Sequence, residues 1–215
     1  MTRRVTALAL LALGLALAHS PVWAEAMALK LLPNYSRATF KSDAPLETFV
    51  GNAAADGIAG ALSVDPERPQ TATGSVKVDM NLVRTGIDKR DADMRAKSFL
   101  DTEVEANRWV TYEIKGVEIA GPLEPGKAVP ARVRGILTVK QRPTERVADT
   151  TVTWIKLTPA QLESQKRFGF TADNIKVRAR FATTFTDHGM QVPQLLIFKV
   201  ANEIHLETDL TFARQ

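Results

Sequence analysis

The sequence predicts an all-β protein, an eight-stranded antiparallel barrel with one or two short helices. Hydrophobic and polar residues alternate along many segments, and Gly, Pro, Asn and Asp separate those segments. Beyond residue 24 no apolar stretch is long enough for a membrane helix. Alternation with a period of two gives each strand one dry and one wet face. Closure into a barrel hides every strand edge, whereas two stacked sheets, the alternative, hide them only in part.

The clearest alternation places Val76, Val78 and Met80 between polar neighbours. Similar patterns, some of them weaker, recur along the chain and make about eight strands, several of them long. The predicted strands cover the ranges 35–41, 58–64, 75–82, 110–115, 131–140, 147–157, 175–185 and 203–212.

Two short helices are expected between these strands. Thr158-Pro159-Ala160-Gln161 has the pattern of a capping box with proline at the first helical position, which predicts a helix over 158–168. The range 88–100 carries good helix formers, with Asp91 and Asp93 in the first turn, where the helix dipole favours acids. The stretch 186–189 predicts a turn between the last two long strands.

The first 24 residues have the organisation of a secretion signal. Arg3 and Arg4 precede an apolar run over 5–18, and Val22-Trp23-Ala24 supplies small residues for cleavage. The alternative, a permanent anchor, is disfavoured because the run is too short to cross a hydrocarbon layer of about 30 Å. We therefore expect a signal peptide at 1–24, one domain at 25–215 with no transmembrane segment, and a periplasmic or secreted location.

The composition excludes several classes of site. The chain has no cysteine and three histidines, and His19 lies in the predicted signal, so disulfides, thiol chemistry and a three-histidine zinc site are ruled out. The 28 Lys and Arg residues nearly balance the 24 Asp and Glu residues, and no basic patch is interleaved with aromatic residues. We expect no cofactor, no metal and no nucleic-acid partner.

An eight-stranded barrel leaves an interior wide enough for side chains or for one slender ligand. The residues on the predicted dry faces are the candidates for such a lining, and a solid core built from the same residues is the alternative. The candidate ligand-binding residues are Val76, Val78, Met80, Tyr112, Ile114, Phe170, Phe181, Phe185, Leu206 and Leu210.

Six segments carry recognisable motifs in a fixed order. The most specific is Arg90-Asp91-Ala92-Asp93-Met94-Arg95 followed by Phe99 and Asp101, which is similar to "R-D-x-H-L-R-S-x-x-F-F-D". The others lie at 35–40, 60–65, 76–86, 135–139 and 168–170. Together they resemble the YceI-like family of secreted, lipocalin-like barrels that bind polyisoprenoids. Tyr35 and Asp93 stand where that family usually has histidine.

The resemblance implies a non-catalytic protein that holds a long-chain isoprenoid lipid or quinone in an apolar interior. An enzyme on the same barrel is one alternative, with Asp88, Asp91 and Asp93 as an acid cluster. That cluster lacks the glycine and the distal glutamate of a calcium loop, and capping with salt bridges explains it. A stress-related protein-interaction module is another alternative. A homodimer stays open, because the apolar segment 195–198 can pack inward or against a second copy.

Overall fold

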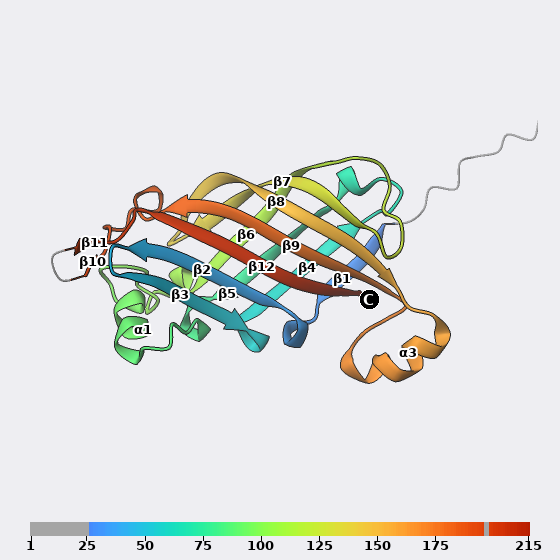
Figure 1. Ribbon diagram of the computed structural model, residues 1–215, viewed down its shortest axis with the longest axis horizontal. Helices are drawn as coiled ribbons and strands as arrows, with labels where there is room; N and C mark the ends of the chain where they lie inside the picture. Colours follow the sequence, from blue (N-terminus) through green and yellow to red (C-terminus); the bar gives the residue numbers. More distant parts are fainter. Residues whose placement is uncertain (1–25, 196–197) are drawn as a thin grey trace, which may run out of the picture.

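A computed structural model describes residues 26–195 and 198–215, and the predicted signal peptide lies outside this part of the chain. Eight antiparallel strands form a closed barrel, because β1 pairs with both β4 and β12 (Figure 1). The barrel strands, in the order of pairing, are β1 (Met27–Leu31), β4 (Ile58–Val64), β5 (Thr73–Asp79), β6 (Trp109–Ile119), β7 (Ala128–Val139), β8 (Arg142–Lys156), β9 (Asp173–Thr184) and β12 (Glu203–Arg214).

A hairpin of β2 (Arg37–Ala44) and β3 (Glu47–Ala54) extends the sheet beside β1. Strand β12 serves both neighbours, since its first half pairs with β2 and its last residues pair with β1. A bridge between Asn52 and Arg84 ties the outer strand of this hairpin to the loop after β5. Two short strands, β10 (Gln194–Leu195) and β11 (Phe198–Lys199), form a separate hairpin at one end of the barrel.

The predicted all-β barrel is confirmed, with one difference in its strands. The range 35–41, expected as a barrel strand, corresponds to β2, and the eighth barrel strand is β1, which the periodicity did not single out. Strand β1 has only five residues. Strand β3 also escaped prediction because its sequence, ETFVGNAA, carries small and polar residues on both faces.

In the described part of the chain, three α-helices and six 3-10 helices connect the strands. The capping box at Thr158 is present, and its hydroxyl accepts from the backbone N–H of Gln161. The helix predicted over 88–100 ends earlier, and none of the described helices is long and apolar enough to span a membrane. The helices are α1 (Asp88–Arg95), α2 (Glu105–Arg108), α3 (Pro159–Gln165), η1 (Pro33–Tyr35), η2 (Ala55–Gly57), η3 (Pro69–Thr71), η4 (Met80–Leu82), η5 (Lys166–Phe168) and η6 (Thr186–His188).

The helices lie at the ends of the barrel rather than across its wall. Figure 1 shows α1 and the β10–β11 hairpin at the left-hand end, with α3 projecting below the right-hand end. The barrel wall itself is therefore made of strands, and its interior is bounded by the inner faces predicted from the alternation.

Candidate ligand cavity

The barrel encloses an apolar cavity of about 170 Å³. Its lining comes from β2, from β4 to β9 and from β12, and is almost wholly aliphatic and aromatic, with Thr39, Thr150 and Thr208 as the polar exceptions. Seven of the ten predicted ligand-binding residues lie on this lining, namely Val76, Val78, Tyr112, Ile114, Phe181, Leu206 and Leu210. The alternating pattern thus identified the inner face of four strands.

The other three predicted residues do not line the cavity, because none of them lies on a barrel strand. Met80 lies in η4, buried in the surrounding core, since the side chain of Asp79 accepts from the N–H of Asn81 and ends the strand. Phe185 follows β9 in a helical conformation that begins η6. Phe170 follows a left-handed glycine and packs against Tyr35, with ring centroids 4.7 Å apart.

The lining also contains residues that the sequence analysis did not single out. Leu62, Leu137, Ile175 and Val177 are examples, and all four lie on strands that were predicted. Their signal was the same alternation of dry and wet positions. Extending the inner face over every predicted strand, rather than choosing the clearest positions, would have found them.

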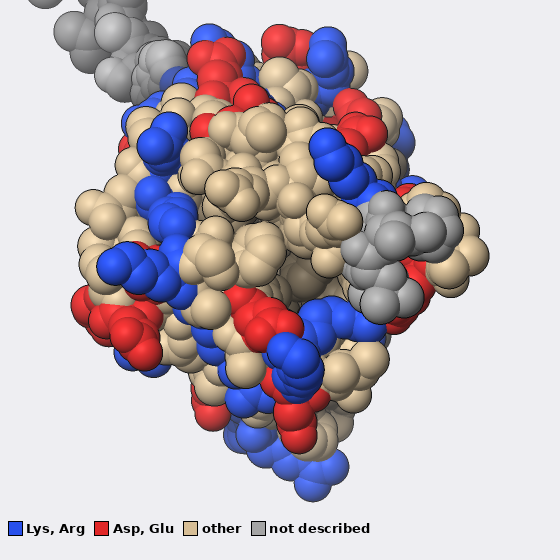
Figure 2. All heavy atoms as spheres, turned by 90° about the vertical axis from the view of Figure 1, so that its left-hand side faces the viewer, with Lys and Arg blue, Asp and Glu red and all other residues tan. Residues whose placement is uncertain are grey.

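Both ends of the barrel carry features that bear on access. At the right-hand end of Figure 1 lie the connection between β4 and β5, which contains η3, and the loop between β6 and β7. Pro69 of η3 and Leu123 of the second loop are buried lining residues, and the N–H of Leu123 donates to the carbonyl of Pro66 at 2.7 Å. Loops therefore cover the cavity there. Figure 2 faces the opposite end and shows a hollow bordered largely by uncharged residues, with charged side chains below it.

Tyr112 is the one hydroxyl-bearing aromatic residue of the lining, and its hydroxyl is already engaged. It lies 2.8 Å from the carbonyl oxygen of Val133 and 3.0 Å from that of Arg146, both acceptors. Burial raises the pKa of Tyr112 to about 12, with a smaller contribution from Glu145. The group is therefore a neutral donor to the protein itself, and the cavity presents no charge to a ligand at this position.

A sequence profile of the YceI-like domain matches residues 29–212. The chain belongs to the YceI-like family. No curated protein matches the sequence significantly.

Solved structures share the fold of this YceI-like chain at low sequence identity. A polyisoprenoid binding domain from Saccharophagus degradans is 14% identical, with a TM-score of 0.62 over 88% of this chain and 99% of that one. Burkholderia cenocepacia BcnA is 14% identical, with a TM-score of 0.60 over 82% and 95% of the two chains. The YceI protein of Campylobacter jejuni is 15% identical, with a TM-score of 0.58 over 77% and 84%.

The acids of the family-like motif around α1 hold the backbone. Asp91, which is 3% exposed, accepts from the hydroxyl of Thr85 at 2.6 Å and from its N–H at 2.8 Å. Burial alone would raise the pKa of Asp91, but these hydrogen bonds and the nearby Arg95 outweigh it, so the pKa lies below its ordinary value. A carboxylate that is ionised and holds a backbone N–H and a hydroxyl suits an anchor and not a general acid.

The remaining polar groups of α1 also have structural partners. Arg95 donates to the carbonyl of Val83 at 2.8 Å and lies 3.9 Å from Asp91, as the four-residue spacing predicts. Arg90 pairs with Glu47 on β3 at 2.6 Å. The exposed Asp93 pairs with Lys89.

A second carboxylate, Asp79, corrects an expectation of the sequence analysis. The alternation placed it on the wet face of its strand, yet it is 1% exposed. Both Nε and Nη2 of Arg108 donate to Asp79, at 2.9 and 2.6 Å. Burial would raise the pKa of Asp79, and these bonds together with the Asn81 N–H lower it below the ordinary value.

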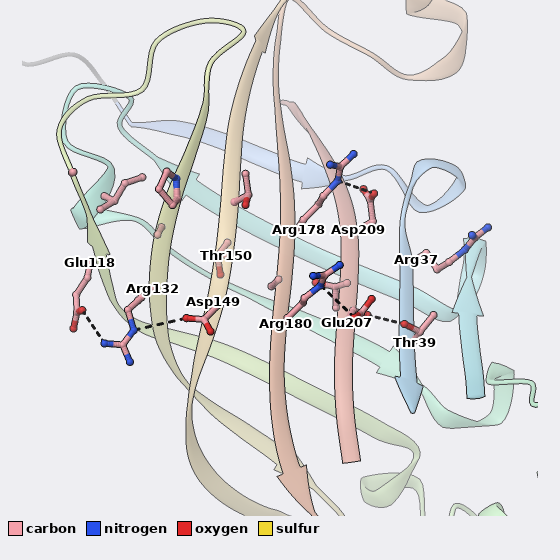
Figure 3. A pocket seen from close by; sticks show the side chains of 17 residues that line it. Arg37, Thr39, Glu118, Arg132, Asp149, Thr150, Arg178, Arg180, Glu207 and Asp209 are labelled. Carbon is pink, nitrogen blue, oxygen red and sulfur yellow. Dashed lines mark hydrogen bonds and ion pairs between the residues drawn. The ribbon is translucent and has the colours of Figure 1, made fainter. Parts of the chain in front are cut away.

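The outer surface of the barrel is also hollowed, over a volume of about 950 Å³ (Figure 3). Charges of alternating sign cross the strands here in register, and each acid faces a base on the next strand. The row across the sheet consists of Glu207, Arg180, Asp149, Arg132 and Glu118. Three of its four neighbouring pairs are ion pairs, at distances between 3.3 and 4.0 Å, and Arg180 and Asp149 are register partners. These charges satisfy one another, so the hollow offers little net field to a charged ligand.

Within residues 26–195 and 198–215, no group of three or more His, Asp or Glu side chains is arranged to hold a metal ion. His188 is fully buried and His205 is exposed beside Glu203. The feature with the chemistry of a binding site is thus the apolar cavity, which suits a hydrocarbon chain.

Proposed function

We propose that this YceI-like protein binds lipid, holding the chain of a polyisoprenoid or an isoprenoid quinone inside its barrel without catalysing a reaction. The observation that carries the proposal is the apolar cavity within a closed barrel, together with the polyisoprenoid-binding relative of the same fold. A lining without charges suits a flexible hydrocarbon, which makes no directional bonds.

The energy of such binding comes from burial of carbon. Each buried CH₂ group contributes about 0.8 kcal/mol, so ten buried carbons give on the order of 8 kcal/mol before losses. Ordering the chain and restricting its motion removes much of that gain. A linear isoprenoid of C15 to C20 has more carbons than the ten counted above, so it is long enough to test whether the cavity binds hydrocarbon.

The direct test is to find the lipid. The mature protein is purified without detergent and extracted with organic solvent, and the extract is analysed by mass spectrometry. Delipidated protein is then offered geranylgeraniol, a C20 isoprenoid alcohol, and native mass spectrometry counts the molecules bound. We expect a co-purifying isoprenoid and one bound geranylgeraniol per chain. Protein that carries no lipid and takes up none at micromolar concentration would contradict the proposal.

The proposed location follows from the signal-like residues 1–24. A periplasmic or secreted barrel would meet isoprenoid lipids at a membrane surface after export. Amino-terminal sequencing of protein from the periplasmic fraction should begin at Glu25. Cytoplasmic protein that retains Met1 would overturn this part of the proposal.

A further inference from the structure

The wall of the barrel has a gap in its hydrogen-bond ladder. Strands β8 and β9 pair from Lys156↔Asp173 as far as Asp149↔Arg180. Beyond that point in the described chain, residues 142–148 pair with β7 and residues 181–184 pair with β12, but the two segments do not pair with each other. Figure 3 shows β8 bending away from β9 beyond Asp149 and Arg180. We call this gap the β8–β9 seam.

Side chains close the seam where the backbone does not. Arg146 of β8 donates to the hydroxyl oxygen of Thr183 on β9 at 3.1 Å and pairs with Asp187 of η6. His188 of η6 lies with Nε2 2.7 Å from the Thr183 hydroxyl and Nδ1 3.3 Å from the carbonyl of Arg142. These four side chains, Arg146, Thr183, Asp187 and His188, form what we call the latch.

The latch has one consistent pattern of protons with a neutral imidazole. The carbonyl of Arg142 can only accept, so Nδ1 of His188 carries the proton and donates to it. Nε2 then accepts from the hydroxyl of Thr183, whose oxygen accepts in turn from Arg146. These hydrogen bonds satisfy both ring nitrogens of His188 and the hydroxyl of Thr183, although no backbone ladder crosses the seam.

The seam is also a wall of the cavity. Ala148 and Phe181 lie opposite each other when the register of β8 and β9 is extended by one residue, and both line the cavity. From inside, the hydroxyl of Tyr112 reaches the carbonyl of Arg146, on the β8 side of the seam. Opening the seam would therefore connect the cavity sideways with the surroundings.

Opening the β8–β9 seam requires less than opening a fully paired part of these same two strands. A strand ladder must lose several backbone hydrogen bonds together, whereas the latch opens by rotation of side chains and movement of η6. The Arg146–Asp187 pair is partly exposed, at 22% and 40% of the two side chains, and such pairs contribute little to stability.

We infer that the lipid chain enters and leaves the cavity sideways through the β8–β9 seam, and that the latch controls the rate of passage. This inference rests on the proposed lipid-binding function. A latch that closes in the same way over the empty and the filled barrel changes the rates of uptake and release by the same factor and leaves the affinity unchanged.

A cross-link across the seam tests the inference. Because the chain has no native cysteine, a thiol-reactive reagent joins only the two cysteines that are introduced. Val147 and Ala182 face outward on the two sides of the seam, so the pair Val147→Cys and Ala182→Cys can be joined by a short bis-maleimide without entering the cavity. The matched control joins Thr151→Cys and Arg178→Cys, which are register partners in the paired part of the same two strands.

Uptake and release of geranylgeraniol are followed with phosphatidylcholine vesicles as donor and acceptor. We expect the seam cross-link to slow both rates at least tenfold with unchanged binding at equilibrium, and the control cross-link to change them less than twofold. Unchanged rates across the sealed seam, or equal slowing by both cross-links, would overturn the inference while the lipid-binding function stands. Failure of the uncross-linked protein to bind geranylgeraniol would overturn that function and the passage with it.

A variant of the latch gives the opposite change. Asp187→Asn removes the charge that holds Arg146, and we expect uptake and release to become at least threefold faster. Asp209→Asn removes a similar ion pair with Arg178 and Lys176 from a fully paired region and should leave both rates unchanged. Equal effects of the two variants, or a change in affinity alone, would contradict a latch at Asp187.

Discussion

At the scale of single residues, the buried polar groups of this barrel serve the backbone. Asp79 accepts hydrogen bonds from Arg108 and from the Asn81 N–H, and Asp91 accepts from Thr85. The ring of His188 makes hydrogen bonds to Thr183 and to the carbonyl of Arg142. Sequence reasoning recognised that Asp91 anchors structure but had no means to find the partners of His188. Thr183 lies only five residues before His188. The Arg142 carbonyl lies 46 residues away, and only the packing of η6 against β8 brings it to the ring.

His188 should make the stability of the protein depend on pH. Burial is the main cause that lowers the pKa of His188, aided by Arg146 and Arg142 and opposed by the Arg142 carbonyl and by Asp187. In the unfolded chain the imidazole titrates near 6.5, so below that pH the unfolded chain binds a proton that the folded chain excludes. The stabilisation is complete above about pH 6.5 and is lost as the pH falls, by at most about 1.4 kcal/mol per pH unit.

Urea unfolding between pH 7.5 and 5 measures this dependence. His188→Gln should lower the stability at pH 7.5 and flatten its decline toward pH 5. His205→Gln, at an exposed site, should keep the wild-type slope. If His188→Gln declines as steeply as the wild type, the buried imidazole is not the group responsible.

Gly135 is required by the ring of Tyr112. A Cβ at residue 135 would lie 2.4 Å from Cε1 of Tyr112 and 2.6 Å from the backbone oxygen of Glu113, and the backbone oxygen cannot move aside cheaply. Gly135→Ala should therefore destabilise the protein by about 1–3 kcal/mol in urea unfolding. Gly116→Ala is the matched control, because its Cβ would meet only the mobile end of Arg134, at 3.1 Å. Equal stability of the two variants would show that the ring of Tyr112 and the backbone at Glu113 both move aside at little cost.

At the scale of elements, the alternation of residue types predicted the long strands well and the strand ends poorly. The range 58–64 was predicted at its observed bounds, because every second side chain there meets the core. Met80 and Phe185 were misplaced because side-chain hydrogen bonding and a helical turn end the strands before them. Local turns of this kind compete with the strand ladder, and the spacing of apolar residues does not reveal them.

The element most open to test is the loop that leads into α1. Asp91→Ala removes two hydrogen bonds to an ionised carboxylate and leaves the Thr85 N–H without its acceptor, so we expect a loss of about 1–3 kcal/mol. Asp93→Ala, on the same helix, removes only the exposed pair with Lys89 and should change stability by less than about 0.5 kcal/mol. Thermal unfolding compares the two variants. Loss of geranylgeraniol binding by Asp91→Ala at unchanged stability would instead place Asp91 in the ligand site.

At the scale of the whole molecule, the sequence predicted a closed barrel but not whether its centre is empty. Alternation shows which face of each strand is dry, and it does not show whether the side chains of opposite walls meet. The lining contains small residues such as Ala38, Ala148 and Ala179 between the larger ones. Small residues at these positions leave space that longer side chains would fill. Whether such space remains depends on how side chains from all eight strands meet across the barrel, and that is known only once the register of the strands is known.

Enlarging one lining residue separates an empty cavity from a solid core. Leu206 on β12 lies opposite Phe181 on β9, and its side chain lines the cavity. In a cavity of about 170 Å³, Leu206→Trp should occupy free volume, so the melting temperature should stay within a few degrees while geranylgeraniol uptake falls at least tenfold. Ala53→Leu is the control for a packed site, since Ala53 is 1% exposed and lies outside the lining, and overpacking there should cost about 1–3 kcal/mol. Melting temperature and bound lipid are measured on the same samples. A Leu206→Trp protein that unfolds as readily as Ala53→Leu would mean that the interior is solid, and a stable variant that keeps its lipid would mean that residue 206 does not face the ligand.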